Sequence, residues 1–157
     1  MGDHYTILRT DASHRDFISL VRMLDQYLAV TDGNDHAFYA PYNTIDQLSR
    51  VVLLYTGGTP VACGALKELE PGILEVKRMF THPEFRGCGY AKRILLELEN
   101  WAREAGGTAC RLETGRRMPD AVALYHQSGY SVIPNYGQYA GVENSICFEK
   151  ILVPPGI

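Results

Sequence analysis

The spacing of apolar residues in the first part of the chain changes from that of a strand to that of a helix. Residues 5–9 read as a short strand, and over residues 17–28 apolar side chains recur at intervals of three and four, as on one face of an amphipathic helix. Ser13 and Asp16 are placed to supply the cap and the first-turn charge of that helix. We therefore expect a strand, a helix and then a loop over the polar, turn-rich stretch 31–41.

The middle of the chain carries the patterns of paired strands and tight turns. Two β-rich runs, 51–55 and 60–66, flank the Gly57-Gly58 dipeptide, which is a strong hairpin signal. Pro71-Gly72 marks a further turn before a strand expected over 73–81. These runs predict three strands linked by short turns.

The last part of the chain alternates helices with strands. Apolar spacing, with Gly106-Gly107 as a stop, predicts a helix whose buried face consists of Ala91, Ile94, Leu95, Leu98, Trp101 and Ala105. Pro119 and Gly129 stand where proline and glycine are favoured, at the first turn of a second helix and just beyond its last turn. The other elements expected are a short helix at 44–48 and strands at 109–113, 130–133 and 145–151.

The order of these elements predicts an α/β fold. Hairpin-linked strands followed by β-α-β crossovers imply a mixed, mostly antiparallel central sheet of six to seven strands, flanked by about four helices. The sequence contains no internal repeat or linker, so we expect residues 1–157 to form one domain.

Composition narrows the classes of partner. The formal net charge is −3 and the pI about 5.9, so no basic field indicates nucleic acid. The four cysteines, Cys63, Cys88, Cys110 and Cys147, show neither a C-x-x-C pair nor Cys/His ligand spacing, so we expect no metal site. We also expect a cytoplasmic chain, because there is no signal peptide and no apolar run near the ~20 residues of a membrane span.

Small residues stand at alternate positions from Gly87 to Ala91, where the helix predicted to bury Ile94, Leu95 and Leu98 should begin. A dinucleotide fingerprint, G-x-G-x-x-G/A, fails because Lys92 occupies its last position, and no stretch fits a P-loop. The pattern R/Q-x-x-G-x-G/A fits Arg86-Gly87-Cys88-Gly89-Tyr90-Ala91 completely. Open backbone N–H groups, the helix dipole and Arg86 together suit a diphosphate. On these six residues alone, a glycine-rich turn remains the alternative.

Two segments resemble the GNAT superfamily of acetyl-CoA-dependent N-acetyltransferases, in its small single-domain bacterial form. Residues 75–95 look like its central strand, phosphate loop and helix, and residues 121–130 are similar to its A-x-x-L-Y-x-x-x-G-F/Y segment. The resemblance implies a GNAT-like fold, acetyl-CoA as cosubstrate and direct attack of a primary amine on the thioester.

The resemblance also implies roles for particular residues. The strand that offers backbone groups to the pantetheine arm corresponds to Met79, Phe80 and Thr81. The pyrophosphate loop corresponds to Arg86, Gly87, Cys88, Gly89, Tyr90 and Ala91, with Lys92 in the first helical turn. Cys88 reads as a spacer, since direct attack needs no enzyme nucleophile. Tyr125 matches the tyrosine that protonates the departing thiolate, and a purely structural core tyrosine is the alternative.

The general base is less closely defined by the resemblance. Glu75 stands where some family members carry a glutamate base, but an ion pair with Lys77 or a solvated strand end would also explain it. Glu113 is the reserve candidate, and water could also deprotonate the amine. Met118 replaces the asparagine that holds the cofactor in many members, and the neighbouring Arg116 and Arg117 either reach phosphate or lie solvated.

The acceptor is expected to be a small protonated amine. The resemblance implies that its pocket lies between the first helical region and the loop that joins the last strands. These segments carry acids and tyrosines, which suit such a group through charge and cation–π contact: Asp32, Asp35, Phe38, Tyr39, Tyr42 and residues 134–139. An amino acid, a polyamine, an aminoglycoside, and a protein lysine or N-terminus all remain open as acceptor. A non-catalytic acyl-CoA-sensing module also remains an alternative. A homodimer is possible, whereas nucleic acid and membrane are not expected as partners.

Overall fold

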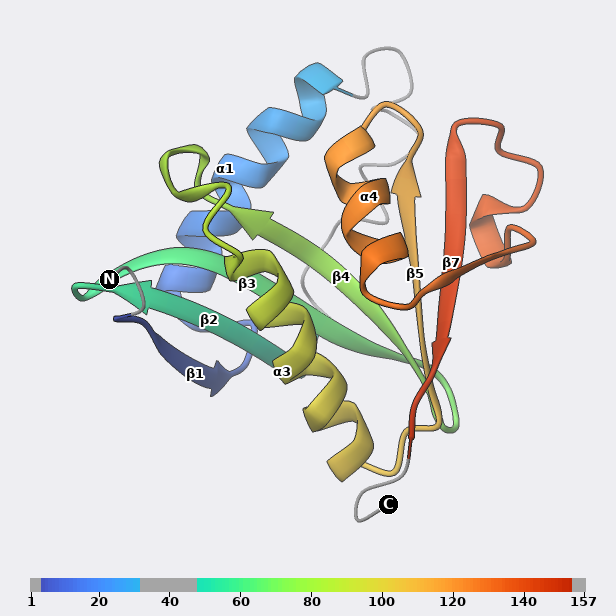
Figure 1. The fold of residues 1–157 in the computed structure, drawn as a ribbon, viewed down its shortest axis with the longest axis horizontal. Coiled ribbons are helices and arrows are strands. Elements are labelled where there is room, and N and C mark those ends of the chain that lie inside the picture. The colour runs from blue at the N-terminus through green and yellow to red at the C-terminus, as the bar shows by residue number, and fades with distance from the viewer. Residues whose placement is uncertain (1–3, 32–47, 154–157) are drawn as a thin grey trace.

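The computed structural model describes residues 4–31 and 48–153. Within them the chain forms one seven-stranded sheet in the order β1-β2-β3-β4-β5-β7-β6 (Figure 1). The strands are β1 (Thr6–Thr10), β2 (Arg50–Thr56), β3 (Thr59–Glu70), β4 (Ile73–Thr81), β5 (Ala109–Gly115), β6 (Ser131–Ile133) and β7 (Ser145–Ile151). β4 and β5 are parallel, and the other neighbours are antiparallel. The predicted mixed, mostly antiparallel sheet is confirmed.

Three α-helices lie within the described residues. They are α1 (Arg15–Thr31), α3 (Tyr90–Glu104) and α4 (Pro119–Gln127), and short 3-10 turns lie at Pro83–Phe85 and Gly137–Tyr139. Figure 1 shows α3 and α4 in front of the sheet. Of the four helices expected, the short one at 44–48 falls almost wholly outside the described residues.

The two faces of the sheet carry separate cores, because successive residues of a strand point to opposite faces. On one face α1 buries Phe17, Leu20, Val21 and Leu24 against side chains of β2, β3 and β4. On the other face α3 and α4 pack over the main core, which includes Val52, Leu54, Val76, Ile94, Leu95, Leu98, Leu112, Tyr125 and Phe148. The sheet is therefore covered by helices on both sides.

Two details of the predicted helices were wrong. His14, and not Ser13, caps the start of α1, since its Nδ1 accepts a hydrogen bond of 3.1 Å from the backbone N–H of Asp16 while Ser13 bonds to Asp11. On α3 the buried face begins at Tyr90 and ends at Ala102, and Ala105 lies exposed just beyond the helix. The apolar stripe follows 3.6 residues per turn and thus reaches Ala102 at the last turn.

The predicted turns are confirmed where glycine is required. Gly57 and Gly58 join β2 to β3 with φ of 55° and 81°, the left-handed conformation that a two-residue hairpin needs at both positions. Gly72, with φ of 83°, links β3 to β4.

A β-bulge in β4 lies beside the point where β4 and β5 separate. The pairs Cys63↔Phe80 and Ala65↔Lys77 leave two residues of β4, Arg78 and Met79, opposite the single Gly64. Arg78 has a φ of 60°, a left-handed conformation that is strained for a residue with a side chain. Pairing of β4 with β5 ends just before, at Glu75↔Arg111, and Figure 1 shows the two strands diverging from there.

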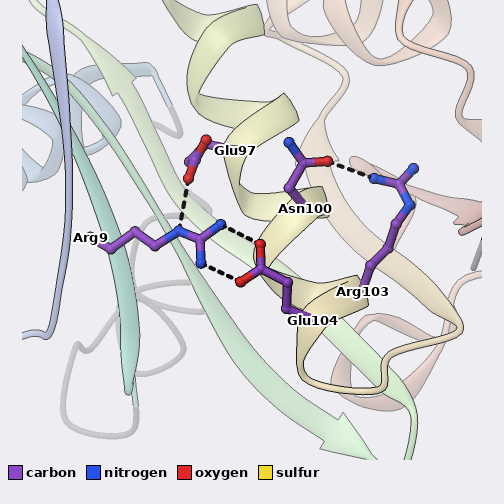
Figure 2. Close-up of polar contacts among 5 residues, drawn as sticks. All are labelled: Arg9, Glu97, Asn100, Arg103 and Glu104. Atoms are coloured by element: carbon purple, nitrogen blue, oxygen red, sulfur yellow. Dashed lines mark hydrogen bonds and ion pairs between the residues drawn. The ribbon is translucent and has the colours of Figure 1, made fainter. Parts of the chain in front are cut away.

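An ion-pair cluster ties the edge strand β1 to α3 (Figure 2). Arg9 Nε donates to Glu97 Oε2 at 2.7 Å, and its two Nη atoms donate to both carboxylate oxygens of Glu104 at 2.7 and 2.9 Å. The guanidinium carbon also lies 4.9 Å from the centre of the Trp101 ring. These contacts help to fix the helix whose first turn follows the glycine loop.

Candidate active site

The larger cavity beside the glycine loop has a volume of about 540 Å³. Nine of the ten residues predicted to contact the cofactor line it: Met79, Phe80, Thr81, Arg86, Gly87, Gly89, Tyr90, Ala91 and Lys92. The tenth, Cys88, is exposed, and its Sγ lies 4.0 Å from the carbonyl oxygen of Arg86. Since Pro119, Asp120 and Leu124 of α4 also line this cavity, it runs between the glycine loop and α4.

The glycine loop has a backbone that side chains disfavour. Gly87 and Gly89 both have a φ of 81°, and a Cβ at either position would meet no protein atom within 4 Å. Gly89 is the N-cap of α3 and has no side chain to accept from the first turn. The first N–H groups of α3, which lack intrahelical acceptors, therefore border the cavity together with the positive end of the helix dipole.

Arg86 connects this loop to the end of β4. Its Nε donates to the carbonyl oxygen of Thr81 at 3.1 Å, and its guanidinium carbon lies 5.3 Å from the ring centre of Tyr27 and 5.9 Å from that of Phe80. The side chain is exposed and lines the larger cavity together with the loop. A ligand with phosphate groups fits this donor set.

A smaller cavity of about 120 Å³ opens between the diverging strands β4 and β5. It shares five lining residues with the larger one: Leu24, Met79, Met118, Ala121 and Tyr125. Lys77 and Arg78 of β4 and Glu113 of β5 line only the smaller cavity. The two cavities therefore meet at a small group of side chains that includes Tyr125.

Tyr125 is held in the core while it borders both cavities. Its side chain is buried, and its ring centre lies 5.9 Å from that of Tyr130 and 5.8 Å from that of Phe148. Burial, with a further contribution from the charge of Glu113, raises the pKa of the Tyr125 phenol above its usual range. The phenol therefore remains protonated at neutral pH, as a proton donor must.

Glu75 lies behind the cavity wall and not on it. It is 2% exposed and is absent from the residues that line either cavity. Tyr136 donates its hydroxyl to Glu75 Oε2 at 2.6 Å, and Lys77 Nζ lies 3.7 Å from Glu75 Oε1. The alternative of an ion pair with Lys77 is thus present, and Glu113 is the predicted carboxylate that borders the same cavity as Tyr125.

The residues around Met118 divide between the cavity and the surface. Met118 lines both cavities, whereas Arg116 and Arg117 are exposed and line neither. Arg116 Nε donates to the carbonyl oxygen of Glu143 at 2.6 Å. Of the residues expected around the acceptor, those between 32 and 42 lie outside the described part of the chain.

The sequence reasoning missed a buried polar cluster behind Tyr125. Glu99 of α3 is 0% exposed and accepts hydrogen bonds of 2.9 Å from both the Tyr130 hydroxyl and Lys150 Nζ. The spacing from Leu95 to Glu99 and Ala102 places this carboxylate on the apolar face of the helix, which was the available signal. A buried carboxylate of this kind requires the partners it has here.

The described residues, 4–31 and 48–153, contain no helix long and apolar enough to cross a membrane. They also contain no group of three or more His, Cys, Asp or Glu side chains arranged to hold a metal ion.

Comparison with known proteins identifies the class of protein that this fold and these cavities define. Residues 17–130 match the Acetyltransferase (GNAT) family. The chain therefore belongs to the GNAT family and is an acetyltransferase.

Individual relatives agree with this assignment. The IAA acetyltransferase of Azospirillum brasilense is 33% identical over 149 residues, which cover 94% of this chain and 97% of the relative. An acyl-CoA N-acyltransferase from Klebsiella pneumoniae has a solved structure that is 29% identical, with a TM-score of 0.79 over 95% of this chain and 98% of that one. A GNAT acetyltransferase from Elizabethkingia anophelis with acetyl-CoA bound shares the fold at 15% identity, with a TM-score of 0.68 over 96% and 99% of the two chains.

Proposed function

We propose that the protein transfers the acetyl group of acetyl-CoA to a primary amine on a small molecule. The observation that carries this proposal is the position of Tyr125, at the junction of a cavity bordered by the glycine loop and a cavity bordered by charged side chains. The cofactor would lie in the first cavity and the amine in the second.

The roles follow from this arrangement. The N–H groups at the start of α3 and the Arg86 side chain bind the pyrophosphate, and the bulged end of β4, from Met79 to Thr81, presents backbone groups to the pantetheine arm. The amine attacks the thioester carbon, and Tyr125 gives its proton to the departing thiolate. Glu113 is the better-placed base, because it borders the cavity with Tyr125 while Glu75 is engaged by Tyr136 and Lys77.

Two observations support a small acceptor over a protein lysine or N-terminus. The cavity between β4 and β5 holds only about 120 Å³. The relative from Azospirillum brasilense, which matches almost the whole chain, is named for acetyl transfer to IAA.

The test is to incubate the purified protein with acetyl-CoA and a panel of primary amines. Acetyl-CoA binding is measured by calorimetry, and turnover by release of free thiol together with mass spectrometry of the product. We expect binding and turnover with at least one small amine. Failure to bind acetyl-CoA would contradict the proposal, and binding without transfer to any amine would support the acyl-CoA-sensing alternative.

A further inference from the structure

Side chains of opposite charge line the two walls of the smaller cavity. Lys77 and Arg78 lie on the wall formed by β4, and Glu113 lies on the wall formed by β5, where the two strands are no longer paired. Much of the remaining lining is apolar: Leu24, Leu28, Val76, Met79, Met118 and Ala121. Charged and apolar side chains therefore both line the space between the two strands, and both can contact a ligand there.

The cationic wall, formed by Lys77 and Arg78, can donate further hydrogen bonds to a ligand. The Lys77 side chain is 10% exposed, and its ion pair with Glu75, the only one it makes with a described residue, spans 3.7 Å, longer than a hydrogen bond. Burial lowers the pKa of Lys77, and the charges of Glu75 and Glu113 offset this lowering only in part. An anionic ligand group beside the ammonium would favour the charged form.

Arg78 adds to this wall. Its Nη2 is paired with Asp25 of α1, but its Nε is buried and has no hydrogen-bond partner among the described residues. The side chain is buried beside the cavity, and the left-handed backbone at φ 60° in the bulge places it there. A strained backbone and an unsatisfied donor at one residue are features that functional sites often carry.

The anionic wall lies next to the proposed proton donor. Glu113 Oε2 accepts a hydrogen bond of 2.7 Å from Ser145 Oγ, which fixes the carboxylate on the wall. Glu113 also contributes to the raised pKa of Tyr125, so the two groups lie close enough to interact through space. An ammonium group bound by Glu113 would therefore lie beside the reacting end of the thioester.

We infer that the acceptor is a small amino acid, which carries a carboxylate as well as its primary amine. This inference rests on the proposed function and names its substrate class. Lys77, supported by Arg78, binds the carboxylate, and Glu113 binds the ammonium group. A zwitterion adds no net charge to the cavity and gives Lys77 an anion at hydrogen-bond distance, whereas a simple amine leaves Lys77 with only its longer contact to Glu75.

The bonds and protons of the transfer balance with these groups. The ammonium nitrogen loses one proton to Glu113, which passes it to water, and then bonds to the acetyl carbon. As the carbon–sulfur bond breaks, Tyr125 gives its proton to the thiolate and regains one from the nitrogen, which loses its second proton as the amide forms. The products are the N-acetyl amino acid, CoA with a free thiol and one proton in solution.

The experiment compares matched acceptors. Thiol release is measured for a set of small amino acids, for their carboxamides and for the amines that lack the carboxylate altogether. We expect kcat/KM for an amino acid to exceed that for its carboxamide and amine by tenfold or more. Comparable values, or transfer only to acceptors without a carboxylate, would overturn this inference but leave the proposed function standing. Absence of transfer to any amine would overturn both.

Three lysine variants test whether Lys77 gives the preference for the amino acid over its carboxamide and amine. Lys77→Met should abolish the preference for the amino acid by raising its KM, with the Kd for acetyl-CoA unchanged as evidence of intact folding. Lys77→Arg keeps the charge and should retain part of the preference. Lys67→Met makes the same change in charge on the neighbouring strand, outside both cavities, and should leave the preference intact. An equal loss in the Lys67 and Lys77 methionine variants would overturn the assignment.

Discussion

At the scale of single residues, Tyr125 combines a structural ring with a reactive hydroxyl. Tyr125→Phe keeps the ring contacts with Tyr130 and Phe148 and removes the proton donor. We expect kcat to fall by about 10²- to 10⁴-fold, the range typical of a lost general acid, with little change in the Kd for acetyl-CoA. Stopped assays of thiol release and calorimetry measure the two quantities separately.

The control for this prediction removes a different tyrosine hydroxyl. Tyr55 donates to Asp16 Oδ2 at 2.7 Å and lines neither cavity. Tyr55→Phe should therefore leave kcat close to that of the unmodified enzyme. Similar kcat values for Tyr125→Phe and the unmodified enzyme would show that Tyr125 serves only the core.

Gly89 has a left-handed backbone and lies beside the proposed pyrophosphate site, so a substitution there affects both the backbone and ligand binding. Gly89→Asp strains the backbone at φ 81° and places a negative charge at the start of α3, against the proposed pyrophosphate site. Gly58 has the same φ and equally open surroundings, but it lies in the hairpin between β2 and β3. We expect Gly89→Asp to weaken acetyl-CoA binding by tenfold or more in calorimetry, while Gly58→Asp leaves it unchanged. Equal Kd values in the two variants would contradict the placement of the phosphates.

At the scale of elements, the approach of α3 to the sheet depends on the absence of a side chain at Gly64. A Cβ there would lie 2.6 Å from Met79 Sδ, 2.7 Å from Ile94 Cγ2 and 2.9 Å from Leu98 Cδ1. Gly64→Ala must therefore move α3 or the bulge, and overpacking of this kind costs about 1–3 kcal/mol of unfolding free energy. Urea unfolding should show this loss.

Gly115 offers a matched position for this comparison. Its φ is not in the left-handed range, and a Cβ there would lie 3.4 Å from its nearest neighbour, Asn144 Nδ2. Gly115→Ala should change the unfolding free energy much less than Gly64→Ala does. Equal losses would mean that the α3 contact is not tightly packed at Gly64.

The elements that the sequence predicts well are those with local signals. Glycine and proline mark both early turns and the ends of α3 and α4, so these boundaries follow from neighbouring residues alone. The bulge at Arg78 has no such signal, because it exists only as a mismatch between β3 and β4. His14 was missed as a cap because a histidine at that position is a weak signal beside Ser13.

The candidate site likewise combines features with a local sequence signal and features that depend on how the strands pair. The contiguous motif forms one side of the larger cavity, since the loop and the helix start are adjacent in sequence, whereas residues of α1 and α4 form the other side and lie apart from this motif in sequence. Which carboxylate borders the reaction space depends on where β4 and β5 stop pairing, and that places Glu113 on the wall and Glu75 behind it. The cationic wall of Lys77 and Arg78 depends on the bulge and was likewise beyond the reach of local patterns.

At the scale of the whole molecule, folding buries several groups that ionise at alkaline pH. Burial raises the pKa of the thiols of Cys63 and Cys110 to about 12, and that of the Tyr55 phenol also to about 12. Desolvation is also the main cause that raises the pKa values of four further phenols, and these lie higher still: Tyr125, Tyr130, Tyr136 and Tyr139. In the unfolded chain the thiols ionise near pH 8.5 and the phenols near pH 10.

The sign of the resulting pH dependence follows from these shifts. Above pH about 8.5 the unfolded chain loses protons that the folded protein still holds. The stabilising contribution of these groups to the unfolding free energy is therefore fully present below that pH and is lost as pH rises toward 12. The urea midpoint should thus fall steadily above pH 9. In a Cys63→Ala, Cys110→Ala variant the onset of the decline should shift toward pH 10, because Cys147 is then the one described thiol with a raised pKa that remains beside the phenols. A midpoint that stays constant to pH 11, or an unchanged onset in the double variant, would show that these groups are more accessible to water than their burial indicates.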